Sequence, residues 1–399
     1  MQIGLNLTSI TPFAREWIFA DPRRQAKVIP PVAPATATGY LTRDLAWTEP
    51  HKFEPAARNG QWARNFTNRV TQFPVLRFMD WQRTNGSPLV AWAVRRTTAN
   101  SFTQADWGGS PQKGVAFELI ADLCKLVTAN PWLCVPHLAD DDFVARMARF
   151  FASNLTSAHT VYLEFSNELW NAGPGFGQGD WVNLNTFAAT PKVTYTKFVG
   201  DHLRRVFGIW SAEFALASAP PRLVRVVAGQ AANPAVATGL CTHLGTGGFD
   251  AVSCAAYFDP RNAANKWPLY DATTTPATIL SDCVAHLRTR TLPNITKHKA
   301  LADTHGVPLL LYEAGQQLTA SGKTVSYQRA MEAAQDDAGM GALYRELLDG
   351  AKAAGVDLLC HYASTDGRDS GGMWGIWETQ DQKRSTKGDA VLDWIKLNP

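Results

Sequence analysis

The stretch VYLEFSNELWN, residues 161–171, begins as an alternating apolar run and ends on an amide, a carboxyl group and a large aromatic ring. Alternation over its first half is typical of a β-strand. A strand can end on any turn residue, whereas this one ends on Asn167, Glu168 and Trp170. These three residue types together indicate side chains that serve a site at the end of the strand.

Seven further short apolar runs recur along the chain. They lie at residues 3–7, 74–79, 132–137, 223–228, 251–257, 307–313 and 357–362. Such runs are typical of parallel strands that are buried on both faces. Apolar positions at helical spacing lie between several of them, at residues 115–128, 143–151, 195–210 and 343–351. Eight strands alternating with helices predict an α/β fold, a (β/α)8 TIM barrel with long βα loops.

A chain of 399 residues has room for one large barrel or for two ordinary domains. We predict a single barrel over residues 1–399. Residues 8–73 are poor in helical periodicity, so we predict a long loop insertion after the first strand, with some helix in it. A doubly wound open sheet is the rival fold, and the lack of a glycine-rich loop after the first run disfavours it.

Composition and charge exclude several classes of partner. A hydrophobic content of 45% with 18% charged residues indicates an ordered globular protein. The net charge of +3 and the absence of a long Lys/Arg block give no electrostatic case for nucleic acid binding. No apolar run approaches the roughly 20 residues of a membrane span. Fourteen tryptophans favour carbohydrate binding weakly, because flat rings stack on sugar faces.

The six cysteines form no CxxC pair and no zinc-finger spacing. We expect buried free thiols, with one or two disulfides as the alternative for an exported protein. The first four residues lack the pattern of a signal peptide, and the chain begins directly on a predicted strand. We therefore expect a secreted or periplasmic protein whose leader is absent from this sequence, with a cytoplasmic location as the alternative. A monomer is expected.

In a barrel of this type the active site lies at the carboxyl ends of the strands. The residues at these ends are Arg77, Asp80, His137, Asn167, Glu168, Gln230, Tyr257, Glu313, His361 and Tyr362. The set holds two glutamates, Glu168 on the fourth strand and Glu313 on the seventh. Two carboxyl groups that face each other across a barrel mouth can cleave a glycosidic bond, because one protonates the leaving oxygen and the other attacks the sugar.

This pairing of Asn-Glu on the fourth strand with a lone Glu on the seventh resembles the clan A (β/α)8 retaining glycoside hydrolases, which include cellulases, mannanases and β-galactosidases. The stretches FPVLRFMDWQRTN (73–85), NPWLCVPHLADDDFV (130–144) and VYLEFSNELWN are also similar to a less characterised bacterial branch described as glycosidase-like or cellulose-binding. The resemblance runs over most of the chain, from the first strand to the eighth.

The resemblance implies an enzyme that hydrolyses a polysaccharide or oligosaccharide by double displacement, with a β-linked glycan favoured. Glu168 matches the acid/base, Glu313 the nucleophile, and Asn167 the residue that contacts the sugar 2-hydroxyl. The long loops and their aromatic residues suggest endo action. This chemistry requires no metal and no organic cofactor.

The resemblance also implies supporting roles. Arg77 matches the arginine that supports the nucleophile, Tyr257 the tyrosine that hydrogen-bonds it, and His137 a histidine that lines the sugar subsite. We add four groups as substrate-binding candidates, Asp80, Trp170, Tyr362 and Trp374, and expect an aromatic wall such as Trp170 to raise the pKa of the acid. The clan usually has a Trp after the eighth strand, whereas here Trp374 comes only later, in GGMWGIW.

Structural readings stand beside the catalytic ones. Glu168 could be a helix N-terminal carboxylate stabilised by the helix dipole, and Glu313 a salt-bridged strand end. Glu164 shares the face of Glu168 in strict alternation, and we expect it to be structural. Asp140 and Asp141 precede a helix and are expected to cap it rather than to join His137 in a metal site.

The main functional alternative is a barrel that binds glycans without cutting them. A degenerate site of that kind is expected to lose one carboxylate, and both are present here. An esterase is a third possibility, but the chain has no GxSxG elbow.

Overall fold

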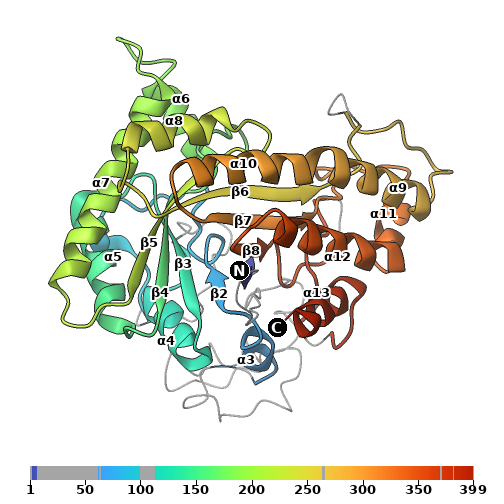
Figure 1. Ribbon diagram of the computed structural model, residues 1–399, viewed down its shortest axis with the longest axis horizontal. Helices are drawn as coiled ribbons and strands as arrows, with labels where there is room; N and C mark the ends of the chain where they lie inside the picture. Colours follow the sequence, from blue (N-terminus) through green and yellow to red (C-terminus); the bar gives the residue numbers. More distant parts are fainter. Residues whose placement is uncertain are drawn as a thin grey trace, which may run out of the picture.

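The computed structural model describes residues 2–6, 62, 64–98, 113–262, 266–368, 371–380 and 382–398. Eight strands close into a barrel in chain order (Figure 1). They are β1 (Gln2–Asn6), β2 (Val75–Arg77), β3 (Asn130–Val135), β4 (Thr160–Phe165), β5 (Arg222–Gly229), β6 (Ala251–Phe258), β7 (Leu309–Gln316) and β8 (Leu358–His361). Each of the eight predicted runs overlaps one of these strands, which confirms the (β/α)8 architecture.

The first strand departs from the predicted pattern. Strands β2 to β8 are parallel, whereas β1 lies between β2 and β8 and is antiparallel to both. An antiparallel strand satisfies the backbone donors and acceptors of its neighbours as well as a parallel one does. Seven parallel strands and one antiparallel strand therefore complete the barrel.

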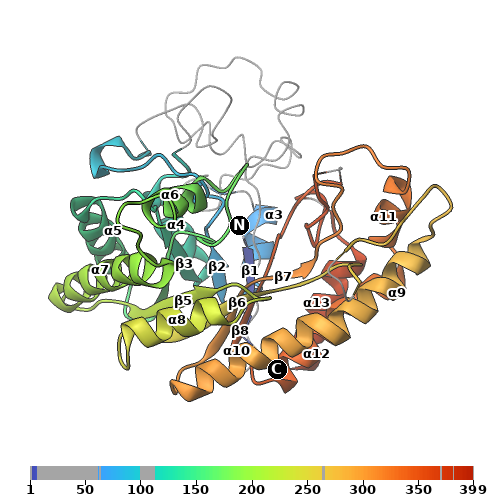
Figure 2. The same ribbon diagram turned by 90° about the horizontal axis from the view of Figure 1, so that it is seen from above.

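Helices surround the strands. They are α3 (Arg64–Val70), α4 (Phe117–Val127), α5 (Asp141–Asn154), α6 (Gly177–Asn185), α7 (Tyr195–Leu216), α8 (Ala235–Leu244), α9 (Pro276–His286), α10 (Leu292–Thr304), α11 (Gln328–Ala334), α12 (Ala338–Ala353) and α13 (Thr386–Leu397). The four helices expected from spacing correspond to α4, α5, α7 and α12. Figures 1 and 2 show α5 and α7 side by side on one flank, and α9 and α10 as one long run beside β6.

The predicted insertion at residues 8–73 is only partly covered. Its end contains α3, in line with the expected helix, while residues 7–61 and 63 lie outside the described residues. The single-barrel boundary therefore stays a prediction. In the described part of the chain, none of the helices combines the length and apolarity that a membrane crossing requires.

Apolar side chains form two layers. A large outer layer fills the space between strands and helices, and a smaller inner cluster fills the barrel. The inner cluster includes Trp132, whose ring stacks on Tyr162 with centroids 5.6 Å apart. All six cysteines are buried and free, which confirms the expected thiols and not the disulfides.

Candidate active site

Arg77, the last residue of β2, joins three strand ends. It is fully buried, and its guanidinium donates to Glu313 Oε1 at 2.9 Å, to Asn167 Oδ1 at 2.8 Å and to Glu164 Oε2 at 2.8 and 3.0 Å. A buried cation is stable only when it is paired and hydrogen-bonded. The planar fork of arginine suits this position because it can serve several acceptors at once.

Glu164 lies inside the barrel on β4, behind the guanidinium. Its Oε2 also accepts a hydrogen bond from Trp132 Nε1 at 2.8 Å. Glu164 is 1% exposed, so its partners are fixed in the packed interior. The expectation that this carboxylate is structural agrees with these contacts, and its structural task is to hold Arg77.

Glu313 reaches the same centre from β7 through a break in strand alternation. The register between β6 and β7 shifts by one residue after Cys254 and Leu311, so Ala255 pairs with Glu313 and Tyr312 is the extra residue. A β-bulge of this kind re-aims side chains. As a result Tyr312 contacts the barrel interior, while its neighbour Glu313 bonds Arg77 and accepts from Tyr257 OH at 2.7 Å.

Glu168 is placed by a tight turn after β4. Ser166 and Glu168 both have left-handed backbones, with φ of 58° and 43°. Tyr312 OH donates to Glu168 Oε1 at 3.0 Å, and Asn171 Nδ2 donates to Oε2 at 2.7 Å. The next helix, α6, begins only at Gly177, so the reading of Glu168 as a helix N-terminal carboxylate is wrong.

Burial dominates the acidity of both glutamates. It raises the pKa of Glu313 to about 7, and the Glu168 charge acts in the same direction while Arg77 opposes it. Burial also raises the pKa of Glu168, against the hydrogen bonds from Tyr312 and Asn171. Three carboxylates around one guanidinium would carry two uncompensated charges if all were ionised, so retention of a proton in this cluster is favoured.

Asn167 is held by a second set of polar groups. Its Nδ2 donates to Asn85 Oδ1 at 3.0 Å, and Gln178 Nε2 donates both to Asn85 Oδ1 and to the Asn167 carbonyl at 2.8 Å. Gln178 comes from α6, and Asn85 from the loop after β2. The sequence analysis did not identify either residue, because neither ends a strand.

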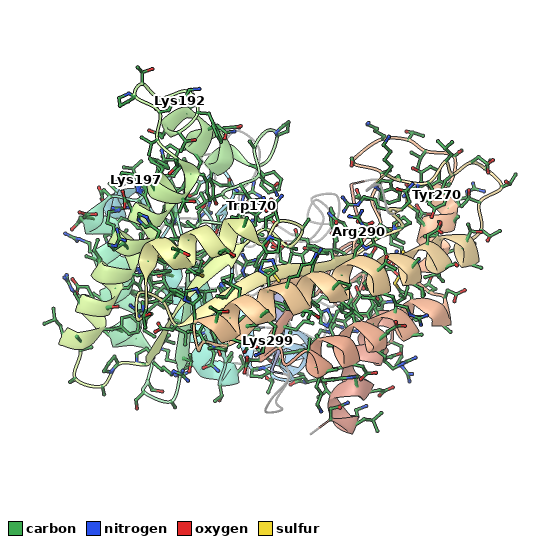
Figure 3. All side chains as sticks on the ribbon, turned by 45° about the horizontal axis from the view of Figure 1, so that its top comes forward. Trp170, Lys192, Lys197, Tyr270, Arg290 and Lys299 are labelled. Carbon is green, nitrogen blue, oxygen red and sulfur yellow. The ribbon has the colours of Figure 1, made fainter. Side chains whose placement is uncertain are left out.

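The aromatic candidates gather around the two glutamates. The Trp170 ring lies 6.4 Å from that of Tyr312, and the Tyr362 ring lies 6.4 Å from Tyr257 and 5.7 Å from Trp374. Trp374 therefore returns to the end of β8 although it lies twelve residues beyond Tyr362. Figure 3 shows Trp170 toward the middle of the molecule, with Tyr270 at its periphery.

Other candidate residues have mixed outcomes. His137 follows β3 and is buried with its ring edge-on to Trp181, and burial lowers its pKa to about 4. Asp80 lies close enough to Glu313 for its charge to raise the pKa of that carboxyl. His361 ends β8 as predicted, but its ring stacks on Tyr344 in the outer layer, because alternation turns it away from the barrel interior.

The two aspartates after β3 have structural contacts. Asp140 accepts from Phe143 N at 2.7 Å and caps α5, as predicted, and Asp141 pairs with Arg205. Within the described residues no group of three or more His, Cys, Asp or Glu side chains could hold a metal ion.

Comparisons with known proteins bear on the fold. No protein-family model and no curated protein sequence matches the chain. The GH51 arabinofuranosidase from Xanthomonas axonopodis pv. citri is similar with a TM-score of 0.53 and 15% identity, over 86% of this chain and 68% of that one. At this identity the likeness shows the fold, a (β/α)8 barrel.

Two more solved structures are similar at lower scores. A 4-O-alpha-L-rhamnosyl-beta-D-glucuronidase from Fusarium oxysporum 12S has a TM-score of 0.49 and 12% identity, over 88% of this chain and 66% of that one. The family 1 b-glucosidase from Thermotoga maritima has a TM-score of 0.44 and 11% identity, over 91% and 92%. At these identities a likeness carries no residue roles over to this chain.

Proposed function

We propose that the protein is a retaining glycoside hydrolase that acts on a polysaccharide or oligosaccharide, with Glu168 as acid/base and Glu313 as nucleophile. The observation that carries the proposal is the pair of glutamates at the ends of β4 and β7, Glu168 half-buried and Glu313 buried, joined through Tyr312 and Arg77. The fold of the similar solved structures supports the same reaction class.

The hydrogen-bond partners assign the charge and the proton. Glu313 bonds a guanidinium directly, which favours its ionised form. Glu168 receives its hydrogen bonds in the described part of the chain from a phenol and an amide, both neutral. The retained proton therefore belongs on Glu168, and the negative charge on Glu313.

The reaction follows from this assignment. Glu313 attacks the anomeric carbon while Glu168 gives its proton to the leaving oxygen, so the glycosidic bond breaks and a glycosyl-enzyme ester forms. Glu168, now ionised, takes a proton from water. The water oxygen then bonds to the anomeric carbon and releases Glu313.

The surrounding residues are suited to hold the sugar. Asn167, fixed by Arg77 and Asn85, presents its amide beside Glu168, where a 2-hydroxyl would lie. Tyr362 and Trp374 offer aromatic faces next to Tyr257, and Trp170 lies beside Tyr312. His137 packs against Trp181 after β3 and stays a candidate for the subsite by resemblance. A β-linked glycan is the part of the proposal that rests on the resemblance alone, and endo action rests on the long loops and their aromatic residues.

The test is a reducing-end release assay over a panel of polysaccharides, with wild type beside Glu168→Gln and Glu313→Gln. Release by wild type that both substitutions abolish, with folding intact by circular dichroism, is expected. Proton NMR of the first product should show the anomeric configuration of the substrate, as retention requires. Release that survives both substitutions would exclude these carboxylates.

An inactive protein would give a different result. Glycan binding without release on any member of the panel would favour a recognition barrel over the enzyme. The two carboxyl groups would then have no catalytic purpose, and replacing both with Gln should leave glycan affinity intact.

A further inference from the structure

Tyr312 connects the two glutamates in a way that neither strand pattern nor composition indicates. Its hydroxyl donates to Glu168 Oε1, and its ring lies under the guanidinium carbon of Arg77 at 5.0 Å from the centroid. The side chain is 1% exposed and also contacts Trp170. Tyr312 is thus fixed on three sides by the barrel.

Asn171 donates to the other oxygen of Glu168, but it is less buried than Tyr312 and lies in a loop. It lies three residues further along the same turn, is only half-buried, and donates to Oε2 at 2.7 Å. The chain that follows contains Gly173 and Gly175, both with left-handed backbones. Of the two donors, Asn171 is the one that belongs to a loop rather than to a strand.

A carboxyl group that protonates a leaving oxygen must turn its own hydrogen toward the substrate. Both oxygens of Glu168 accept hydrogen bonds here, so the substrate oxygen must approach beside one of these two donors. Tyr312 is locked in the barrel, whereas a substrate oxygen can displace the amide of Asn171.

We propose that Tyr312 is a positioning residue that anchors Glu168 through Oε1, and that Oε2, covered by Asn171, is the oxygen that transfers the proton. This inference rests on the proposed hydrolase reaction. In the forward step the proton leaves Oε2 for the glycosidic oxygen, and Oε1 keeps its bond to Tyr312 throughout. The proton taken from water in the second step returns to Oε2.

The groups that face Glu168 give a pH-dependent readout. Arg77 on β2 and the hydrogen bonds from Tyr312 and Asn171 favour its ionised form, whereas Glu164 on β4 opposes it. The charge of Glu168 in turn acts on Glu313 on β7 and Tyr257 on β6. Removing a donor from an ionised acceptor raises the pKa of that acceptor, by about one pH unit for one hydrogen bond to a charged group.

The experiment titrates Glu168 directly by 13C NMR of protein labelled at the glutamate δ-carbon, with the signal assigned by its loss in Glu168→Gln. Tyr312→Phe and Asn171→Ala are each expected to raise the pKa of Glu168 by about one unit. Tyr162→Phe, which removes the hydroxyl of another tyrosine in the barrel, is the matched control and should leave the pKa unchanged. If the Tyr312→Phe variant is folded and the pKa of its Glu168 is unchanged, the proposed anchoring role of Tyr312 is contradicted.

Kinetics on a substrate found in the glycan panel separate the two oxygens. The alkaline limb of the pH profile of kcat/KM should shift to higher pH by about one unit in both variants. The limiting value of kcat/KM at lower pH, where Glu168 is protonated, should fall further in Tyr312→Phe than in Asn171→Ala. The reverse order would make Oε1 the transferring oxygen. If no glycan is cleaved, the hydrolase proposal fails, and the NMR titration still decides whether Tyr312 holds Glu168.

Discussion

The end of β4 and the bulged part of β7 each place a glutamate at the proposed active site. The groups that bind these two glutamates differ. In the described part of the chain Glu313 is bound by a cation from β2 and a phenol from β6, both of which belong to strands. Glu168 is bound by a phenol from β7 and by an amide of its own turn. Burial raises the pKa of both, and therefore the charge of the partner, rather than burial, distinguishes nucleophile from acid.

The backbone devices differ as well. A left-handed turn places Glu168 after the strand has ended, whereas a bulge places Glu313 inside a strand that continues to Gln316. A turn can adjust during a reaction, while a residue within a packed strand stays fixed. This difference suits an acid that hands a proton back and forth and a nucleophile that must meet one carbon atom.

The largest effect on activity is expected from replacing Glu313, the proposed nucleophile. Glu313→Gln should lower kcat/KM by at least about 10⁵-fold, because no covalent intermediate can form. Its free energy of unfolding should stay near that of wild type, since an amide keeps the shape of the side chain. Steady-state kinetics with urea denaturation of the same samples measures both. A residual rate above about 1% would assign the nucleophile elsewhere.

Loss of the shared cation comes next. Arg77→Met should lower the free energy of unfolding by about 3–5 kcal/mol, because Glu164 and Glu313 remain buried without their partner. Without the cation the folded-state pKa of Glu313 rises further above its unfolded value. The deficit should therefore grow as pH rises above about 7, where Glu313 ionises in folded wild type but not in the variant, and should be smaller below it.

Urea denaturation at several pH values measures this deficit. The matched control is Arg146→Met, which removes an exposed pair with Asp142 on α5 and should cost less than about 1 kcal/mol. Equal losses in the two variants would show that Arg77 is not the centre of the cluster.

Replacing Glu168, the proposed acid, should reduce the cleavage rate less than replacing Glu313 does, and the reduction should depend on the substrate. Glu168→Gln is expected to slow cleavage of glycans by about 10³-fold, because an alkoxide leaves poorly without a proton. Aryl glycosides with acidic phenols need little protonation, so their cleavage should fall far less in the glycosylation step. Comparing the two substrate types by burst kinetics checks this. Equal losses on both would argue against Glu168 as the acid.

The smallest effect is expected from a substitution at the cap of α5, away from the two glutamates. Asp140→Ala removes the cap of α5 and should lower the free energy of unfolding by about 1 kcal/mol. Urea denaturation measures it, and kcat/KM should stay within twofold because Asp140 contacts Phe143 N on the outer helix. A metal role for Asp140 would instead make activity sensitive to chelators and to this substitution.

Much of the site follows from strand position alone. Parallel strands present their carboxyl ends at one rim, so Arg77, Tyr257 and Glu313 could be predicted as neighbours from three separate runs. Local alternation also separates Glu164 in the barrel from Phe165 outside it. The structure brings Tyr362 and Trp374 together too, although only the former directly follows a strand.

Other features depend on information that one-dimensional patterns do not carry. Strict alternation puts Tyr312 and Glu313 on opposite faces, and only the register shift against β6 reveals that both serve the centre. Asn85 and Gln178 come from a loop and a helix whose approach to Asn167 is set by tertiary packing. The apolar residues of β1 likewise do not predict its direction, because the same pattern suits a parallel and an antiparallel strand.

The six buried thiols give this barrel built-in reporters of local opening. Three lie on strands and three on helices, namely Cys134, Cys254 and Cys360, and Cys124, Cys241 and Cys283. An alkylating reagent reaches such a group only when its surroundings separate, so each labelling rate measures the opening of one sector. Mass spectrometry of the labelled peptides would then order those sectors by the ease with which they come apart, without any introduced probe.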